Sequence, residues 1–204
     1  GYLIAYSVED TKTFTGSLNT ATETENLSYT ENGEVYGDGW NLLGNPYPSA
    51  IDWDLLGKSV SIFGSVYAVK ASDGTYISYN GSDGDLTGGV IPPHQGFFVQ
   101  AEAASQTVTI ETGDQVHPNH AFYKSEEVID ETLKVSLKGQ ESENNTYFQF
   151  RNDATADFDN HADAYKLFGW ATIAQVYSEL NDMKYSINCL PHSQETVTVP
   201  LGIQ

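Results

Sequence analysis

The sequence predicts an all-β protein made of two consecutive antiparallel units, each resembling a β-sandwich or jelly roll. Three observations support this fold class. Apolar residues alternate with polar ones over short runs along most of the chain, which is the pattern of half-buried strands. Gly, Asn, Asp and Pro separate these runs, as turn residues do. The runs also recur at roughly ten-residue spacing, which is typical of sandwiches.

The first unit is expected over residues 1–117. Its strands are predicted at 2–8, 13–19, 40–44, 65–70, 75–80, 96–101 and 107–112. The pair Asp73-Gly74 predicts a hairpin turn between two of these runs. Residues 50–60 alone have helical spacing, with Ser49 as a candidate N-cap, and should form one or two helical turns inside a connection.

The second unit is expected over residues 118–204, after a polar segment that places a boundary near His117. Its strands are predicted at 132–139, 145–153, 164–169, 175–180, 185–190 and 195–202. The last run contains Pro200 and has no closing turn. Two alternatives therefore stay open: this sandwich lacks its final strands, or a partner supplies one.

Composition excludes several classes of partner. Nine Lys and Arg residues stand against 28 Asp and Glu residues, for a net charge of −19, which repels nucleic acid and anionic lipid. No apolar run reaches the roughly 18 residues of a membrane span, so no membrane insertion is expected. The single cysteine, Cys189, excludes an intrachain disulfide and a thiolate metal site, and is expected to be buried.

Several motifs together carry a family resemblance. They are "GYLIAYS", "TFTGSLNT", "GWNLLGNPYPSAIDWD", "GVIPPHQGFFVQA", "AFYKS" and "NDATADFDNHADAYKLFG". As a set they resemble a β-rich region of large secreted and cell-surface proteins of Bacteroidota, found upstream of a type IX secretion sorting domain. The resemblance implies export, a secreted or cell-surface location and neighbouring domains in the same protein. It implies no reaction.

The stretch 39–54 concentrates aromatic and short polar side chains, a composition that suits sugar binding. Its first half is interpreted as architecture, with Trp40 in the core and Asn45 capping backbone amides of a rigid turn. Trp53 lies between two aspartates, which predicts partial exposure. A second exposed aromatic is expected at a strand end, where it either binds a sugar or covers the rim. The predicted ligand-binding residues are Trp53, Asp52, Asp54, Tyr47 and Trp170.

Four aspartates crowd the segment 152–165 and form the candidate metal site. Asp153, Asp157, Asp159 and Asp163 offer the hard oxygen ligands that Ca²⁺ prefers. The alternative is that these carboxylates point apart and only solubilise the surface. Asp83 and Asp85 flank a glycine but lack the spacing of a calcium loop, so they are interpreted as a solvated turn.

No catalytic motif is present, so the chain is not expected to be an enzyme. The preferred role is carbohydrate binding or adhesion within a multidomain protein, with a polysaccharide or surface glycan as partner. A structural spacer is the alternative, and a fragment of a glycoside hydrolase is the third hypothesis. Exposed aromatics on one sheet face favour the first, buried tryptophans the second, and a cleft with paired carboxylates the third.

Overall fold

The computed structural model describes residues 13, 15–31, 33, 37–117, 131–139, 142–193 and 196–204. The predicted all-β fold is confirmed. Within these ranges the regular structure consists of strands and three short 3₁₀ turns, arranged in four sheets. No helix in the described ranges has the length and apolarity to cross a membrane.

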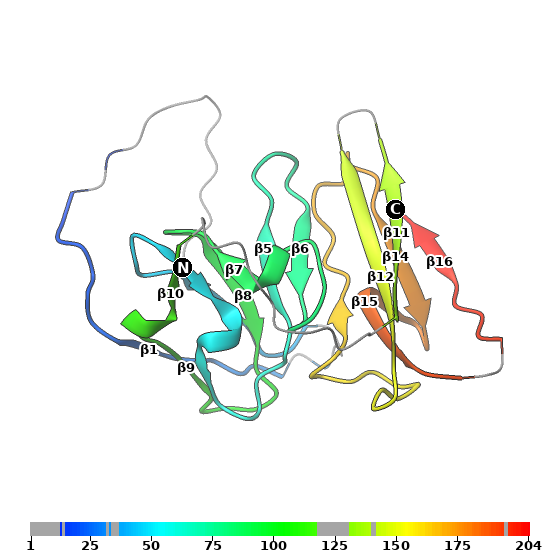
Figure 1. The fold of residues 1–204 in the computed structure, drawn as a ribbon, viewed down its shortest axis with the longest axis horizontal. Helices are drawn as coiled ribbons and strands as arrows, with labels where there is room; N and C mark the ends of the chain where they lie inside the picture. The colour runs from blue at the N-terminus through cyan, green and yellow to red at the C-terminus, as the bar shows by residue number, and fades with distance from the viewer. Residues whose placement is uncertain are drawn as a thin grey trace.

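Strands β1 to β10, called here the first unit, build three of the sheets (Figure 1). A four-stranded sheet has the order β2-β8-β5-β6, and three-stranded sheets have the orders β1-β9-β4 and β10-β3-β7. The strands are β1 (Glu23–Asn26), β2 (Trp40–Gly44), β3 (Ala50–Asp52), β4 (Gly57–Lys58), β5 (Val66–Val69), β6 (Tyr76–Tyr79), β7 (Val90–Ile91), β8 (Gly96–Gln100), β9 (Thr107–Ile110) and β10 (Gln115–Val116).

Strands β11 to β16, called here the second unit, form one sheet at the other end of the molecule (Figure 1). Its order is β11-β12-β15-β14-β16, and β13 also pairs with β15. The strands are β11 (Glu131–Lys138), β12 (Glu143–Arg151), β13 (Ala164–Tyr165), β14 (Val176–Leu180), β15 (Met183–Pro191) and β16 (Leu201–Ile203). One pair departs from the antiparallel expectation, because β12 and β15 run parallel. The connection between them, which holds β13 and β14, is long enough for that crossover.

The four-stranded sheet carries a core on both faces. Phe97 and Val99 of β8 point into the core of the first unit, whereas Phe98 points to the opposite face and packs against a second cluster. That cluster joins Tyr67 of the first unit to Tyr147 and Ile187 of the second. The period-two alternation of β8 thus places one side of this sheet against the second unit.

Three local predictions need correction. Described residues 13 and 15–19 form no strand, and of the last predicted run, 195–202, only residues 201 and 202 are extended, as the start of β16. The helical turn is a 3₁₀ turn over Trp53–Leu55, and Asp52 rather than Ser49 caps it. The run 2–8 lies outside the described residues, and so does segment 118–130, which begins at the predicted boundary between the units.

Candidate functional site

The predicted aromatic platform is not assembled. Trp53 is 1% exposed, and its indole Nε1 donates to Gly64 O at 2.8 Å. Tyr47 is also fully buried, and its hydroxyl lies within hydrogen-bond distance of two carbonyl acceptors, Ala21 O at 2.8 Å and Ile110 O at 3.0 Å. The expectation that Trp53 is partly exposed is therefore wrong. Both rings are core residues of the first unit.

The 3₁₀ turn explains why two flanking carboxylates do not prevent this burial. Successive side chains of such a turn point about 120° apart, so Trp53 faces the core while its neighbours stay near the surface. Asp52 accepts from Asp54 N at 3.0 Å and caps the turn. Asp54 is exposed and accepts from the hydroxyl of Tyr79 at 2.8 Å.

Trp170 is the most exposed predicted aromatic, with 61% of its surface accessible. One side of its ring covers the backbone of Gly74, where the Cβ of any larger residue would collide with ring carbons. Gly74 has a φ of +67°, so both its conformation and its contact require glycine. Trp170 of the second unit therefore covers the β5–β6 turn, far in sequence from Trp53.

The four aspartates of the predicted calcium site do not share one site: three have different hydrogen-bond partners and one is exposed. Asp153 forms a two-point ion pair with Arg151, at 3.0 and 2.9 Å. Asp159 caps His161 N at 2.9 Å. The carboxylate of Asp163 accepts from Asp159 N and Cys189 N. Asp157 is exposed. The described residues contain no group of three or more His, Cys, Asp or Glu side chains suited to a metal ion.

Asp163 is the unusual member of this set because it is 1% exposed. Burial raises its pKa to about 6, against the opposing effect of two backbone hydrogen bonds. Burial disfavours the charged form of a carboxyl group. The group therefore titrates within a physiological range and anchors the 159–163 turn to β15.

Asp83 and Asp85, interpreted from sequence as a solvated turn, instead fasten the two units together. Asp83 Oδ2 accepts from Gln149 Nε2 at 2.6 Å and from Thr132 Oγ1 at 2.7 Å. Asp85 Oδ1 accepts from Tyr147 OH at 2.8 Å. These bonds all cross from the first unit to the second, so the turn is part of the interface.

A polar pocket opens where β8 ends, next to that interface. It encloses about 210 Å³. Its lining includes Tyr29, Asp38 and Phe63 together with Gln100, Ala101 and Glu102 at the end of β8. Asn160 enters from the second unit, and its backbone carbonyl accepts from Gly64 N at 2.9 Å. The pocket therefore combines residues from both units.

Two residues that line this pocket each carry a buried acceptor oxygen without a donor. Gln100 is 2% exposed; its Nε2 donates to Asp38 O at 2.9 Å, which leaves Oε1 buried without a partner. Glu102 Oε1 is likewise buried and unpartnered. Leaving a buried polar atom unsatisfied costs roughly 1–3 kcal/mol. A ligand that donates hydrogen bonds would recover that cost once these side chains turn their oxygens toward the pocket.

The composition of the polar pocket suits a polyhydroxylated ligand. Hydroxyl groups donate to amide and carboxylate oxygens, and the rings of Tyr29 and Phe63 offer apolar surface for C–H groups. Sequence reasoning missed this site because Tyr29, Gln100 and Asn160 are far apart in the chain. The available signal was local: two polar residues, Gln100 and Glu102, follow an apolar strand at i and i+2, which places both on one face.

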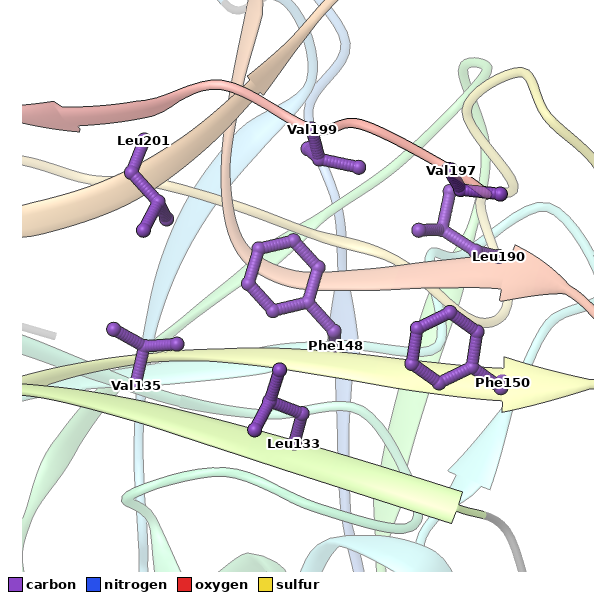
Figure 2. A pocket seen from close by; sticks show the side chains of 8 residues that line it. All are labelled: Leu133, Val135, Phe148, Phe150, Leu190, Val197, Val199 and Leu201. Atoms are coloured by element: carbon purple, nitrogen blue, oxygen red, sulfur yellow. The ribbon is translucent and has the colours of Figure 1, made fainter. Parts of the chain in front are cut away.

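A second hollow is apolar and lies on the outer face of the second unit (Figure 2). It encloses about 230 Å³. Figure 2 shows Leu133 and Phe148 of neighbouring strands facing Val199 of the C-terminal segment. Leu133 is 55% exposed and Leu201 51%. This apolar groove is lined by Leu133, Val135, Phe148, Phe150, Leu190, Val197, Val199 and Leu201.

Comparison with known proteins gives a family and no activity. No curated protein matches the chain. No solved structure matches it either. One family model, described as a domain of unknown function, matches residues 3–204 and so spans both units. This chain is thus a member of the DUF8693 family.

Proposed function

We propose that this chain is a non-catalytic binding module that takes a sugar residue of a glycan into the polar pocket. The observation that carries the proposal is the pair of buried acceptors, Gln100 Oε1 and Glu102 Oε1, which have no donor. Sugar hydroxyls are donors of the right size and number. The proposal keeps the carbohydrate-binding role predicted from sequence and moves it away from Trp53.

The surroundings of the two acceptors favour a sugar over a small ion. Tyr29 is 37% exposed and lines the same pocket, so an apolar C–H face of a sugar ring has a surface to contact. Asp38 and Glu102 add carboxylate groups, and hydrogen bonds to charged acceptors are stronger than those to neutral ones. The net charge of −19 favours a neutral glycan over an anionic one.

A glycan array and a pull-down with insoluble polysaccharides test this function on the full chain. Two variants probe the pocket: Glu102→Gln removes one acceptor and the charge, and Tyr29→Ala removes the ring. Glu102→Gln should weaken binding at least about tenfold, because a hydrogen bond to a charged group contributes roughly 1.5–3 kcal/mol. Tyr29→Ala should also weaken binding, because the sugar loses its apolar contact with the ring. Glu25→Gln, an exposed residue of β1, is the matched control. Binding that neither pocket variant changes would reject the site.

Calcium dependence is tested in the same assay. Arg151 and backbone amides engage the carboxylates of Asp153, Asp159 and Asp163, so EDTA should leave binding unchanged. Loss of binding in EDTA would instead support the calcium prediction. The resemblance to exported proteins makes the proposed location extracellular, which fractionation of cells that express the full-length protein would test.

A second candidate function is a structural spacer in a multidomain surface protein. The observation that favours it is the polar interface between the units, in which Asp83 and Asp85 accept hydrogen bonds from side chains of β11 and β12. A spacer needs its parts to keep one relative orientation. Small-angle scattering should then fit a single rigid shape, whereas a distribution of shapes would argue against this role.

A further inference from the structure

Lys166 is a lysine in an unusual place. It directly follows β13 and is only 7% exposed. Its backbone N–H donates to Lys184 O of β15, which fixes the start of the side chain. The amine Nζ reaches the side chain of Asn144 in β12 and donates to its Oδ1 at 2.7 Å. Asn144 is itself 3% exposed, so the two side chains meet away from water.

The surroundings of Lys166 favour a neutral amine. Among the described residues, Asn144 Oδ1 is the one acceptor within hydrogen-bond distance of Nζ, and no carboxylate lies within ion-pair distance. Burial lowers the pKa of Lys166 to about 8, and the more distant charge of Asp85 opposes this only in part. A buried lysine that loses its proton near neutral pH is a nucleophile.

The carboxamide of Asn144 is arranged as an electrophile. Its Oδ1 accepts a second hydrogen bond, from the backbone N–H of Val176 at 2.9 Å. That donor is held by β14 and points at the oxygen on which negative charge would develop during attack at Cγ. Fixed backbone donors of this kind stabilise tetrahedral intermediates. The hydrogen bond also holds Nζ next to the carboxamide whose Cγ it would attack, and such an attack requires a separation of about 3–3.5 Å.

We propose that Lys166 and Asn144 join through an intramolecular isopeptide bond. The lone pair of neutral Nζ attacks Cγ of Asn144, and the carbonyl electrons move onto Oδ1. The proton that the attacking nitrogen must lose is transferred to Nδ2. The Cγ–Nδ2 bond then breaks, its electron pair leaves with the nitrogen, and one ammonia is released. A secondary amide between Nζ and Cγ remains, and no oxidant or co-substrate is consumed.

The bond would tie β12 to the segment that follows β13. The enclosed chain includes the acidic stretch 152–163, which contains no strand. A covalent tie restricts the unfolded chain as a disulfide does. With one cysteine in the whole sequence, the chain has no disulfide for this purpose, and a lysine–asparagine bond would supply the same restraint without redox chemistry.

Intact-mass spectrometry of the full chain tests the proposal. After incubation of the folded protein at pH 9, its mass should lie below the sequence mass by about 17 Da, the mass of one ammonia. A tryptic digest should contain a branched peptide that joins Lys166 to Asn144. A folded protein that keeps the unmodified mass overturns the proposal.

Two variants separate this reaction from other losses of ammonia. Lys166→Met keeps the length of the side chain and should keep the full mass, whereas Lys134→Met on exposed β11 should still lose one ammonia. The Asn80-Gly81 pair could lose the same mass by forming a succinimide, and that loss would persist in Lys166→Met. Persistence in that variant, or the absence of the branched peptide, overturns the proposal.

Discussion

Tyr147 donates its phenolic hydrogen to Asp85 Oδ1 at 2.8 Å, across the interface between the two units. Burial, and then the hydrogen bond to Asp85, raise the pKa of Tyr147. Its hydroxyl therefore keeps its proton and remains a donor at neutral pH. The same oxygen accepts from Asn145 Nδ2, also at 2.8 Å. One carboxylate of a turn thus accepts hydrogen bonds from two side chains of a strand more than 50 residues later in the sequence.

Replacing Asp85 with alanine should destabilise the whole molecule. Both donors of β12 would lose their acceptor, and hydrogen bonds to charged groups contribute roughly 1.5–3 kcal/mol. Urea denaturation should therefore give a free energy of unfolding lower by about 2–3 kcal/mol. The matched control is Asp157→Ala. Asp157 is exposed, so this substitution should change the free energy of unfolding by less than about 0.5 kcal/mol. Equal effects of the two substitutions would show that the Asp85 contacts do not couple the units.

Trp53→Ala should lower the free energy of unfolding, because Trp53 is a core residue and not an exposed ligand-binding residue. The ring is fully buried and packs edge-on against Phe97, with centroids 6.5 Å apart, and deleting a buried aromatic costs about 3–5 kcal/mol. Trp170→Ala is the comparison, because a side chain that is 61% exposed should cost about 1 kcal/mol. Urea midpoints that rank the two variants in the opposite order would contradict the burial of Trp53.

Local chemistry made much of the fold predictable. The 40–44 and 96–101 runs are rich in apolar residues and bounded by Gly, Asn and Pro, and they pair as β2 and β8. Asn45 is the cap that the Asn-Pro-Tyr-Pro sequence predicts: its Oδ1 accepts from Tyr47 N, and its Nδ2 donates to Ser49 O. Such features depend on neighbours in the sequence, so a single sequence reveals them.

The candidate site could not be predicted in the same way. The burial of Trp53 depends on a 3₁₀ turn. The prediction of its exposure assumed that the carboxylates on both sides would keep the ring at the surface. The polar pocket depends on packing that brings Asn160 against β8, and the function of Asp83 and Asp85 depends on a strand that begins 58 residues after Asp85, at Glu143. Contacts at such separations follow from tertiary structure and leave no periodic signal in the sequence.

The titration of Asp163 predicts how stability changes with pH. Its pKa rises from the ordinary value of 3.8 to about 6 in the folded chain, so the folded state binds the proton more tightly than the unfolded state. The stabilising contribution is complete below about pH 4 and is lost as the pH rises through about 6. At 1.36 kcal/mol per pKa unit, the change amounts to about 3 kcal/mol.

The measurement compares the wild type with Asp163→Asn, which does not titrate. The difference in free energy of unfolding between them should be about 2–2.5 kcal/mol more favourable to the wild type at pH 4 than at pH 7, because the unfolded group is already partly ionised at pH 4. Other carboxylates titrate equally in both proteins and cancel. A difference that stays constant between these pH values would mean that Asp163 is charged in the folded state at both.

Gly74 and Gly81 separate backbone strain from steric contact. Both have positive φ, +67° and +93°, but only at Gly74 would a Cβ collide with the ring of Trp170, whereas nothing lies within 4 Å of a Cβ at Gly81. Gly81→Ala should therefore cost about 1 kcal/mol from strain alone, and Gly74→Ala about 2–4 kcal/mol in total. Adding Trp170→Ala to Gly74→Ala should recover the excess, because the clash disappears with the ring. Equal costs for the two glycine variants, or no recovery in the double variant, would show that Trp170 does not rest on this turn in solution.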